Sequence, residues 1–322
     1  MNDVRIGPPD PAPPQDLGGG TWLLDTGLGG MPRTIGVFLQ HLPDGRAALI
    51  EAGSGATAQA LQAQLQDLGV GPRDLAALIV THVHLDHAAA AGTLSAWADA
   101  PVYVHPSGLR HLHDPAKLWA SAARLYGDAM DALWGPMQPV PEARLQALED
   151  GQELTLGGRS YRAVHTPGHA RHHLSLLGPD GEAYAGDAAG IQLPGSPLIR
   201  PALPPPDVDL EAAEASCRRL ADARPARLLL THFGPVDDPQ AHLAAVPERN
   251  RAWAEEVRRG LDAGEDEDAL IRRMEALEEA EMDEAGLTGP SDTPVRAHLK
   301  ASSDARMTVM GLVRYWRTRT RD

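Results

Sequence analysis

The heptapeptide at residues 81–87, Thr-His-Val-His-Leu-Asp-His, constrains this chain more than any other segment, because it places four potential metal ligands within six residues. The apolar run before it is typical of a buried strand, and the alanine-rich segment after it favours a helix. In extended backbone, residues two apart point the same way, so His82 and His84 can reach one ion. Where the chain turns into the helix, Asp86 and His87 become neighbours that could reach a second ion.

Three later segments offer further ligands, each at the end of a strand-like run. Residues 160–164 lead to a Pro-Gly turn that presents His169, while two other short runs end at Asp187 and His232. A catalytic site needs about three protein ligands for each metal and one position for water. The candidates could therefore complete two sites with nitrogen and oxygen donors, which suit zinc, iron or manganese. The alternative is a histidine-rich surface loop.

In this order, the residues resemble the metallo-β-lactamase fold superfamily, in which a His-x-His-x-Asp-His loop is followed by a histidine, an aspartate and a final histidine. The resemblance covers roughly residues 21–235 and implies an α/β (α+β) fold, a four-layer αββα sandwich. It also implies two divalent metal ions, most simply zinc. By this resemblance the first metal is held by His82, His84 and His169, the second by Asp86, His87 and His232, and Asp187 bridges the two.

Several residues of this chain differ from those typical of particular branches of the superfamily, and these differences indicate which branch the chain resembles most. The only cysteine, Cys217, lies outside every motif, whereas the zinc β-lactamases often use cysteine at the second site, so a penicillinase is disfavoured. The flavodiiron oxidoreductases typically have glutamate where this chain has His84, which favours hydrolysis. The bridging aspartate and the Thr-Pro-Gly-His turn look most like glyoxalase II and the acyl-homoserine lactonases. The alternatives are a mononuclear iron persulfide dioxygenase-like oxidoreductase and a phosphodiesterase of the same fold.

Two further residues are expected to support the ligands. Glu51 stands where the family usually has an aspartate before a small residue and glycine, so the charge is kept on a longer side chain. His173 occupies the position of the family's second histidine after the Pro-Gly-His turn and could orient a ligand by hydrogen bonding. A hydrogen-bonded core histidine without a role at the metals is an equal alternative there.

The resemblance implies a hydrolase in which two cations share a bridging hydroxide. Such cations lower the pKa of water toward neutrality and polarise the carbonyl or phosphoryl oxygen under attack. Asp86 is the expected proton carrier, because it would touch that water and could pass its proton toward the leaving group. The Gly-x-Ser-x-Gly signature of a serine nucleophile is absent from the sequence. We therefore expect cleavage of a small ester, thioester or lactone.

Composition limits the partners. The 322 residues include 29 basic and 44 acidic side chains, a net charge of -15, which disfavours nucleic acid because phosphate backbones demand concentrated positive charge. One cysteine cannot form an intrachain disulfide. The sequence shows neither an apolar signal segment at its start nor an apolar stretch of about 18 residues. We expect a cytoplasmic enzyme with a small-molecule substrate and no membrane partner. Both a monomer and a homo-oligomer are compatible with the sequence.

Three parts are predicted along the chain: a flexible Pro/Gly-rich arm over residues 1–20, a catalytic domain over 21–240 and a C-terminal helical region over 241–322. Interleaved strands and helices in the catalytic domain fit two sheets flanked by helices. Strands are expected at 21–25, 35–41, 46–51 and 102–105, and helices at 56–68, 209–221, 241–260, 268–284 and 304–319.

Residues 106–141 are predicted to be a helical insert with two apolar stripes, one starting at Leu118 and the other at Trp119. A surface helix needs only one stripe, so the second could line a substrate pocket, pack in the core or contact another subunit. His111 and His113 of the insert are not expected to be ligands. Residues 265–284 carry ten acids against two arginines, which we interpret as a solvated helix face.

Overall fold

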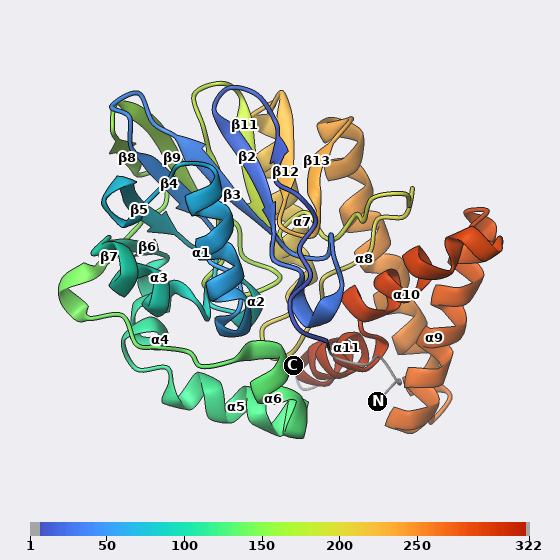
Figure 1. Ribbon diagram of the computed structural model, residues 1–322. Coiled ribbons are helices and arrows are strands. Elements are labelled where there is room, and N and C mark those ends of the chain that lie inside the picture. The colour runs from blue at the N-terminus through green and yellow to red at the C-terminus, as the bar shows by residue number, and fades with distance from the viewer. Residues whose placement is uncertain (1–6, 320–322) are drawn as a thin grey trace. The chain divides into compact units, whose positions relative to one another are not determined.

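The computed structural model describes residues 7–319, which Figure 1 draws as a coloured ribbon. The chain forms two compact units. Unit 1 consists of Met1–His165 and His172–Ala185, and unit 2 of Thr166–Arg171 and Gly186–Asp322. The first six residues of the expected arm and the last three of the expected C-terminal region lie outside the described residues.

A seven-stranded sheet in unit 1 has its strands in chain order from β1 to β7. The strands from β1 to β4 pair antiparallel, and those from β4 to β7 pair parallel. The central strands are buried almost throughout, which is typical of a sheet covered on both faces. The strands are β1 (Gln15–Asp16), β2 (Thr21–Asp25), β3 (Gly36–His41), β4 (Ala47–Ile50), β5 (Leu75–Ile79), β6 (Val102–Val104) and β7 (Leu145–Ala147).

Strands of a second sheet face the first one within unit 1. They pair antiparallel in the order β11, β10, β9, β8. Phe38 of β3 meets Tyr184 of β11 edge to face, with ring centroids 5.3 Å apart, and the Tyr184 hydroxyl donates to Gln40 Oε1 at 3.3 Å. The bounds are β8 (Glu153–Leu156), β9 (Arg159–His165), β10 (Leu174–Leu177) and β11 (Glu182–Gly186).

Helices cover the seven-stranded sheet because their apolar faces join its core. Leu61 and Leu65 of α1 and Leu94 of α3 belong to the same buried cluster as Leu49 of β4 and Leu78 of β5. The predicted mixed α/β class with two sheets and flanking helices is thereby confirmed. These helices are α1 (Ala58–Asp67), α2 (Leu85–Ala88) and α3 (Ala91–Ala98).

The insert is helical, as predicted, but Gly127 divides it. Its φ of 52° and ψ of -128° lie outside helical geometry, and glycine reaches them without a steric penalty. Members of both apolar stripes pack into one cluster with Leu85 and Ala89, so the second stripe serves the core of unit 1. The helices are α4 (Leu109–His113), α5 (Ala116–Tyr126) and α6 (Met130–Trp134).

The arm expected to be flexible up to Gly20 contains a strand. Gln15 and Asp16 form β1, which pairs with the edge of β2, and the backbone N–H of Ala12 donates to Asp25 Oδ2 at 2.7 Å. A proline-rich segment can pair along a sheet edge, because an edge strand needs hydrogen-bond donors on one side only. The expectation of a wholly flexible arm is corrected at these residues.

In the residues that the structure describes, unit 2 contains a hairpin of two strands and five long helices, and four of these helices match predicted ones. Asp209 caps α7, its side chain accepting from the Ala212 backbone N–H at 3.0 Å. No helix within residues 7–319 is long and apolar enough to cross a membrane. The elements are β12 (Arg227–Leu230), β13 (Gly234–Val236), α7 (Leu210–Asp222), α8 (Pro239–Asp262), α9 (Glu267–Glu284), the unpredicted α10 (Thr293–Ser302) and α11 (Ala305–Arg319).

The interpretation of residues 265–284 as a solvated face is wrong for part of α9. Glu278 is only 2% exposed and Glu281 only 9%. Arg200 forms an ion pair with Glu281, and Ser303 Oγ donates to Glu278 Oε1 at 2.9 Å. The partners of these acids come from distant parts of the chain, so helical periodicity could not reveal them.

Candidate metal centre

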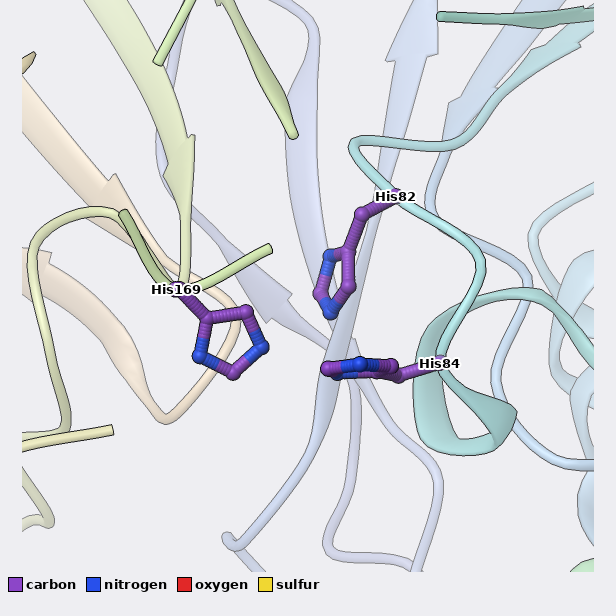
Figure 2. A group of neighbouring side chains, drawn as sticks. All are labelled: His82, His84 and His169. Carbon is purple, nitrogen blue, oxygen red and sulfur yellow. The ribbon is translucent and has the colours of Figure 1, made fainter. Parts of the chain in front are cut away.

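The loop after β5 carries four of the candidate ligands. β5 ends at Ile79 and α2 begins at Leu85, so His82 and His84 lie in the loop and the other two in the first turn of the helix. The His82 ring centroid is 4.5 Å from that of His84 and 4.0 Å from that of His87. Figure 2 shows the His82 and His84 rings converging edge to face. The chain bends at His82, is extended at His84 and enters α2 at the next residue, which brings these imidazoles together.

The spacing of ligand atoms in this loop suits a metal ion. His87 Nε2 lies 3.4 Å from Asp86 Oδ2, which is longer than an ordinary N–H···O hydrogen bond of about 2.7–3.2 Å. Two atoms bound tetrahedrally at about 2.0–2.1 Å from one zinc ion are about 3.4 Å apart. The pair is therefore spaced as two ligands of one ion would be.

Glu51 is fully buried and contacts the metal loop through Thr81 and His87. Its Oε1 accepts from Thr81 Oγ1 at 2.6 Å, its Oε2 accepts from the Thr81 backbone N–H at 3.1 Å, and its Oε1 lies 3.0 Å from His87 Nδ1. Engaging Nδ1 orients His87 so that Nε2 faces Asp86. The backbone of Glu51 has a φ of +73°, in the left-handed region that residues other than glycine rarely adopt. The longer side chain found in place of aspartate reaches both Thr81 and His87.

Unit 2 gathers the other three candidates around one carboxylate. Asp187 Oδ2 lies 3.4 Å from His169 Nε2, and Asp187 Oδ1 lies 3.5 Å from His232 Nε2. All three side chains are buried. His169 Nδ1 lies 2.8 Å from the Ala202 carbonyl oxygen, which orients Nε2 toward Asp187. One carboxylate thus faces two imidazoles through different oxygens, an arrangement that suits a ligand shared by two ions.

The turn that carries His169 rests directly on α7. Gly168 has a φ of +134°, and a Cβ there would lie 2.4 Å from Ala213 Cα. The Gly168 carbonyl accepts from the Asp209 backbone N–H at 2.9 Å, and Ser216 Oγ donates to the Pro167 carbonyl at 2.7 Å. Only glycine fits this close approach of the turn to the helix.

Two consecutive histidines follow that turn, and the structure places both near the metal loop. His173 is fully buried, with its ring centroid 5.0 Å from that of His82. His172 is not among the site residues predicted from the sequence, and its ring centroid lies 5.9 Å from that of His84 and 6.0 Å from that of His111. The repeated histidine was a signal in the sequence, but its proximity to the insert depends on the tertiary fold.

Cys217 is buried in α7, where its Sγ donates to the Ala188 carbonyl at 3.4 Å. Burial raises the pKa of its thiol to about 12. A thiol in that state is neutral at physiological pH and is a poor metal ligand. Histidine and aspartate side chains, in contrast, form groups that could bind metal ions.

Comparisons with known proteins identify the family to which the chain is similar. The model of the metallo-beta-lactamase superfamily matches residues 28–232. The chain is 28% identical over 202 residues to the metallo-beta-lactamase fold-containing protein ST1585 of Sulfurisphaera tokodaii, covering 61% of this chain and 74% of that protein. It is 25% identical over 255 residues to the probable metallo-hydrolase YqjP of Bacillus subtilis, covering 72% and 78%.

A solved structure shows the same fold. The metallo-beta-lactamase family protein TTHA1429 from Thermus thermophilus matches with a TM-score of 0.61 at 24% identity, and the match covers 95% of each chain. The sandwich fold predicted from the sequence, with its C-terminal helical extension, is therefore confirmed.

Proposed function

We propose that this chain, which belongs to the metallo-beta-lactamase superfamily and is a metal-dependent hydrolase, uses two metal ions in catalysis. Its substrate would be a small ester, thioester or lactone, as in the glyoxalase II and lactonase branch. The observation that carries the proposal is the Asp187 carboxylate, whose two oxygens face the Nε2 atoms of His169 and His232 at 3.4 and 3.5 Å. His169 and His232 fall in different groups of possible metal ligands, as is expected when two ions share the carboxylate.

The proposed ligands all supply nitrogen or oxygen, which suits zinc, with iron or manganese as alternatives. Support comes from three groups of side chains that could hold an ion, one of which is drawn in Figure 2. These groups are His82, His84 and His169; His82, His87 and Asp187; and Asp86, His87 and His232. We assign the first group to one metal and the last to the other, with Asp187 shared.

Bound divalent ions would supply a water nucleophile at neutral pH and polarise the carbonyl oxygen under attack. The protein's own residues orient the ligands and handle the proton. Glu51 and the Ala202 carbonyl each engage an Nδ1, so His87 and His169 present Nε2. The Asp86 side chain is 19% exposed while that of His87 is fully buried. A carboxylate open to solvent is suited to pass a proton to a leaving group.

The test is to measure metal content and turnover together. Protein loaded with zinc, iron or manganese is expected to hold about two ions per chain, to hydrolyse members of an ester, thioester and lactone panel, and to lose that activity with a chelator. Asp86→Asn is expected to lower kcat by roughly 10²- to 10⁴-fold with unchanged folding. Asp128→Asn, at an exposed position in the insert, is the matched control and should leave kcat unchanged.

Full hydrolase activity after complete metal removal would contradict the proposal. One iron per chain with oxygen uptake on a persulfide would indicate dioxygenase chemistry instead. Activity confined to phosphodiesters would indicate that the chain is a phosphodiesterase of the same fold.

A further inference from the structure

A small cavity in unit 2 adjoins two of the proposed ligands. Its volume is about 10 Å³, which is room for one water molecule. Apolar groups such as Leu203 and Val246 form part of the wall, and the polar side chains that line it belong to His169, Asp187 and Asn250. The cavity is therefore polar on the side of the candidate metal centre.

Asn250 lies on α8 and is only 5% exposed. Within residues 7–319, no group of the protein makes a hydrogen bond to its Oδ1. Buried amide oxygens are nearly always satisfied, either by protein groups or by ordered water. Asn250 lines the cavity and its Oδ1 lacks a partner among the described residues, so ordered water is the remaining kind of partner.

We propose that the cavity holds one water molecule, which donates one hydrogen bond to Asn250 Oδ1 and the other to the Asp187 carboxylate. Each carboxylate oxygen has two lone pairs, so an oxygen that binds a metal can still accept from water. Asn250 is then a positioning residue that acts on the metals through Asp187. This inference rests on the proposed function, because Asp187 is assigned as a ligand there.

Other contacts in unit 2 already hold the main chain beside Asp187. His242 Nε2, also on α8, lies 2.8 Å from the Ala189 carbonyl oxygen, and Cys217 Sγ donates to the Ala188 carbonyl. These bonds constrain the backbone on either side of the carboxylate. The water bridge from Asn250 would add a contact to the Asp187 carboxylate itself.

The test compares zinc affinity in variants of the full chain by competition with a chelator. Asn250→Leu keeps the number and branching of the side-chain heavy atoms and removes the acceptor. Supporting groups of this kind typically contribute 10- to 100-fold to metal affinity, so zinc should bind more weakly by about that factor. Gln64→Leu is the matched control, because Gln64 is also a buried amide, 7% exposed, whose Oε1 lacks a protein partner in the described chain. It should lower the melting temperature of the metal-free protein without changing zinc affinity.

Each outcome decides between the hypotheses. Unchanged zinc affinity in Asn250→Leu, or an equal loss in Gln64→Leu, would overturn the water bridge and leave the proposed function standing. Wild-type protein that binds no metal would overturn both. Should Asn250→Leu fail to fold, a high-resolution crystal structure of the wild-type zinc protein decides: a water between Asn250 Oδ1 and Asp187 supports the proposal, and a dry cavity overturns it.

Discussion

Glu51 illustrates how much one side chain can contribute to the candidate metal centre. A buried carboxylate is costly unless hydrogen bonds satisfy it, and Glu51 is satisfied by Thr81 and His87 of the metal loop. Its backbone adopts a left-handed conformation that costs roughly 1–3 kcal/mol for a residue other than glycine. The surrounding contacts therefore maintain Glu51 in this position against a local penalty.

Replacing Glu51 with glutamine tests this role at the scale of the residue. Glutamine keeps the size but exchanges one acceptor oxygen for an N–H donor, which cannot accept from Thr81. We expect zinc affinity to fall by about 10- to 100-fold and the free energy of unfolding to fall by about 1–3 kcal/mol. Chelator competition and urea unfolding measure the two effects.

Glu149→Gln, at an exposed position, is the control for loss of one negative charge and should change neither quantity. Glu51→Asp keeps the charge but shortens the reach, so it should retain the bonds to Thr81 better than the one to His87. If Glu51→Gln bound zinc as tightly as wild type, the loop would be held without this carboxylate.

At the scale of the element, the position of the turn that carries His169 depends on its packing against α7. Two adjacent backbone contacts anchor the turn, one through Asp209 and one through Ser216. Gly168 lets the turn approach Ala213 more closely than any side chain would permit. The position of His169 is thus a property of a turn and a helix packed together.

Gly168→Ala should push the turn away from α7. Gly195→Ala is the matched control, because Gly195 also has a positive φ, +81°, but has no atom within 4 Å of the position of a Cβ among the described residues. Both substitutions introduce backbone strain, and Gly168→Ala adds overpacking, so it should cost about 1–3 kcal/mol more. It should also lower kcat, since His169 moves with the turn.

Thermal or urea unfolding of both variants, with turnover measured in parallel, checks this prediction. Equal destabilisation of the two variants would show that the turn can relax away from α7 at no cost. Full turnover in Gly168→Ala would show that the turn can move without displacing His169.

At the scale of the whole molecule, the burial of Glu278 links stability to pH. Burial raises the pKa of its carboxyl from 4.5 to about 7. An acid with a higher pKa in the folded chain binds more protons when folded, so its ionisation favours unfolding. This penalty begins as the pH rises above about 4.5 and is complete somewhat above pH 7, where it reaches up to about 3 kcal/mol.

Glu278→Gln should therefore raise the free energy of unfolding at pH 8 by up to about 3 kcal/mol and change it little at pH 4.5. Glutamine keeps an oxygen that can accept from Ser303 Oγ. Glu275→Gln, at an exposed position on the same helix, is the control. Urea unfolding between pH 4.5 and 8 measures the difference, and a pH-independent effect of Glu278→Gln would contradict the assignment.

Much of the fold could be predicted because its signals are local. Apolar runs and helical spacing located β2 to β6 of the first sheet and four helices of unit 2 to within a few residues, whereas β1 and β7 were not predicted. The order of histidines and aspartates, each placed where a strand ends, indicated the superfamily and its metal-dependent chemistry. At strand ends and in the first turns of helices, backbone periodicity alone predicts the direction in which each side chain points.

Contacts between distant residues were decided only by the tertiary structure. The reach of Glu51 to His87, the approach of His172 to His111 and the burial of Glu278 beside Arg200 and Ser303 all join segments far apart in the chain. No periodicity marks such pairs, because their energies depend on packing and desolvation in the folded state. The sequence alone determined which chemical groups are available, and the tertiary structure decided how each is oriented and how deeply it is buried.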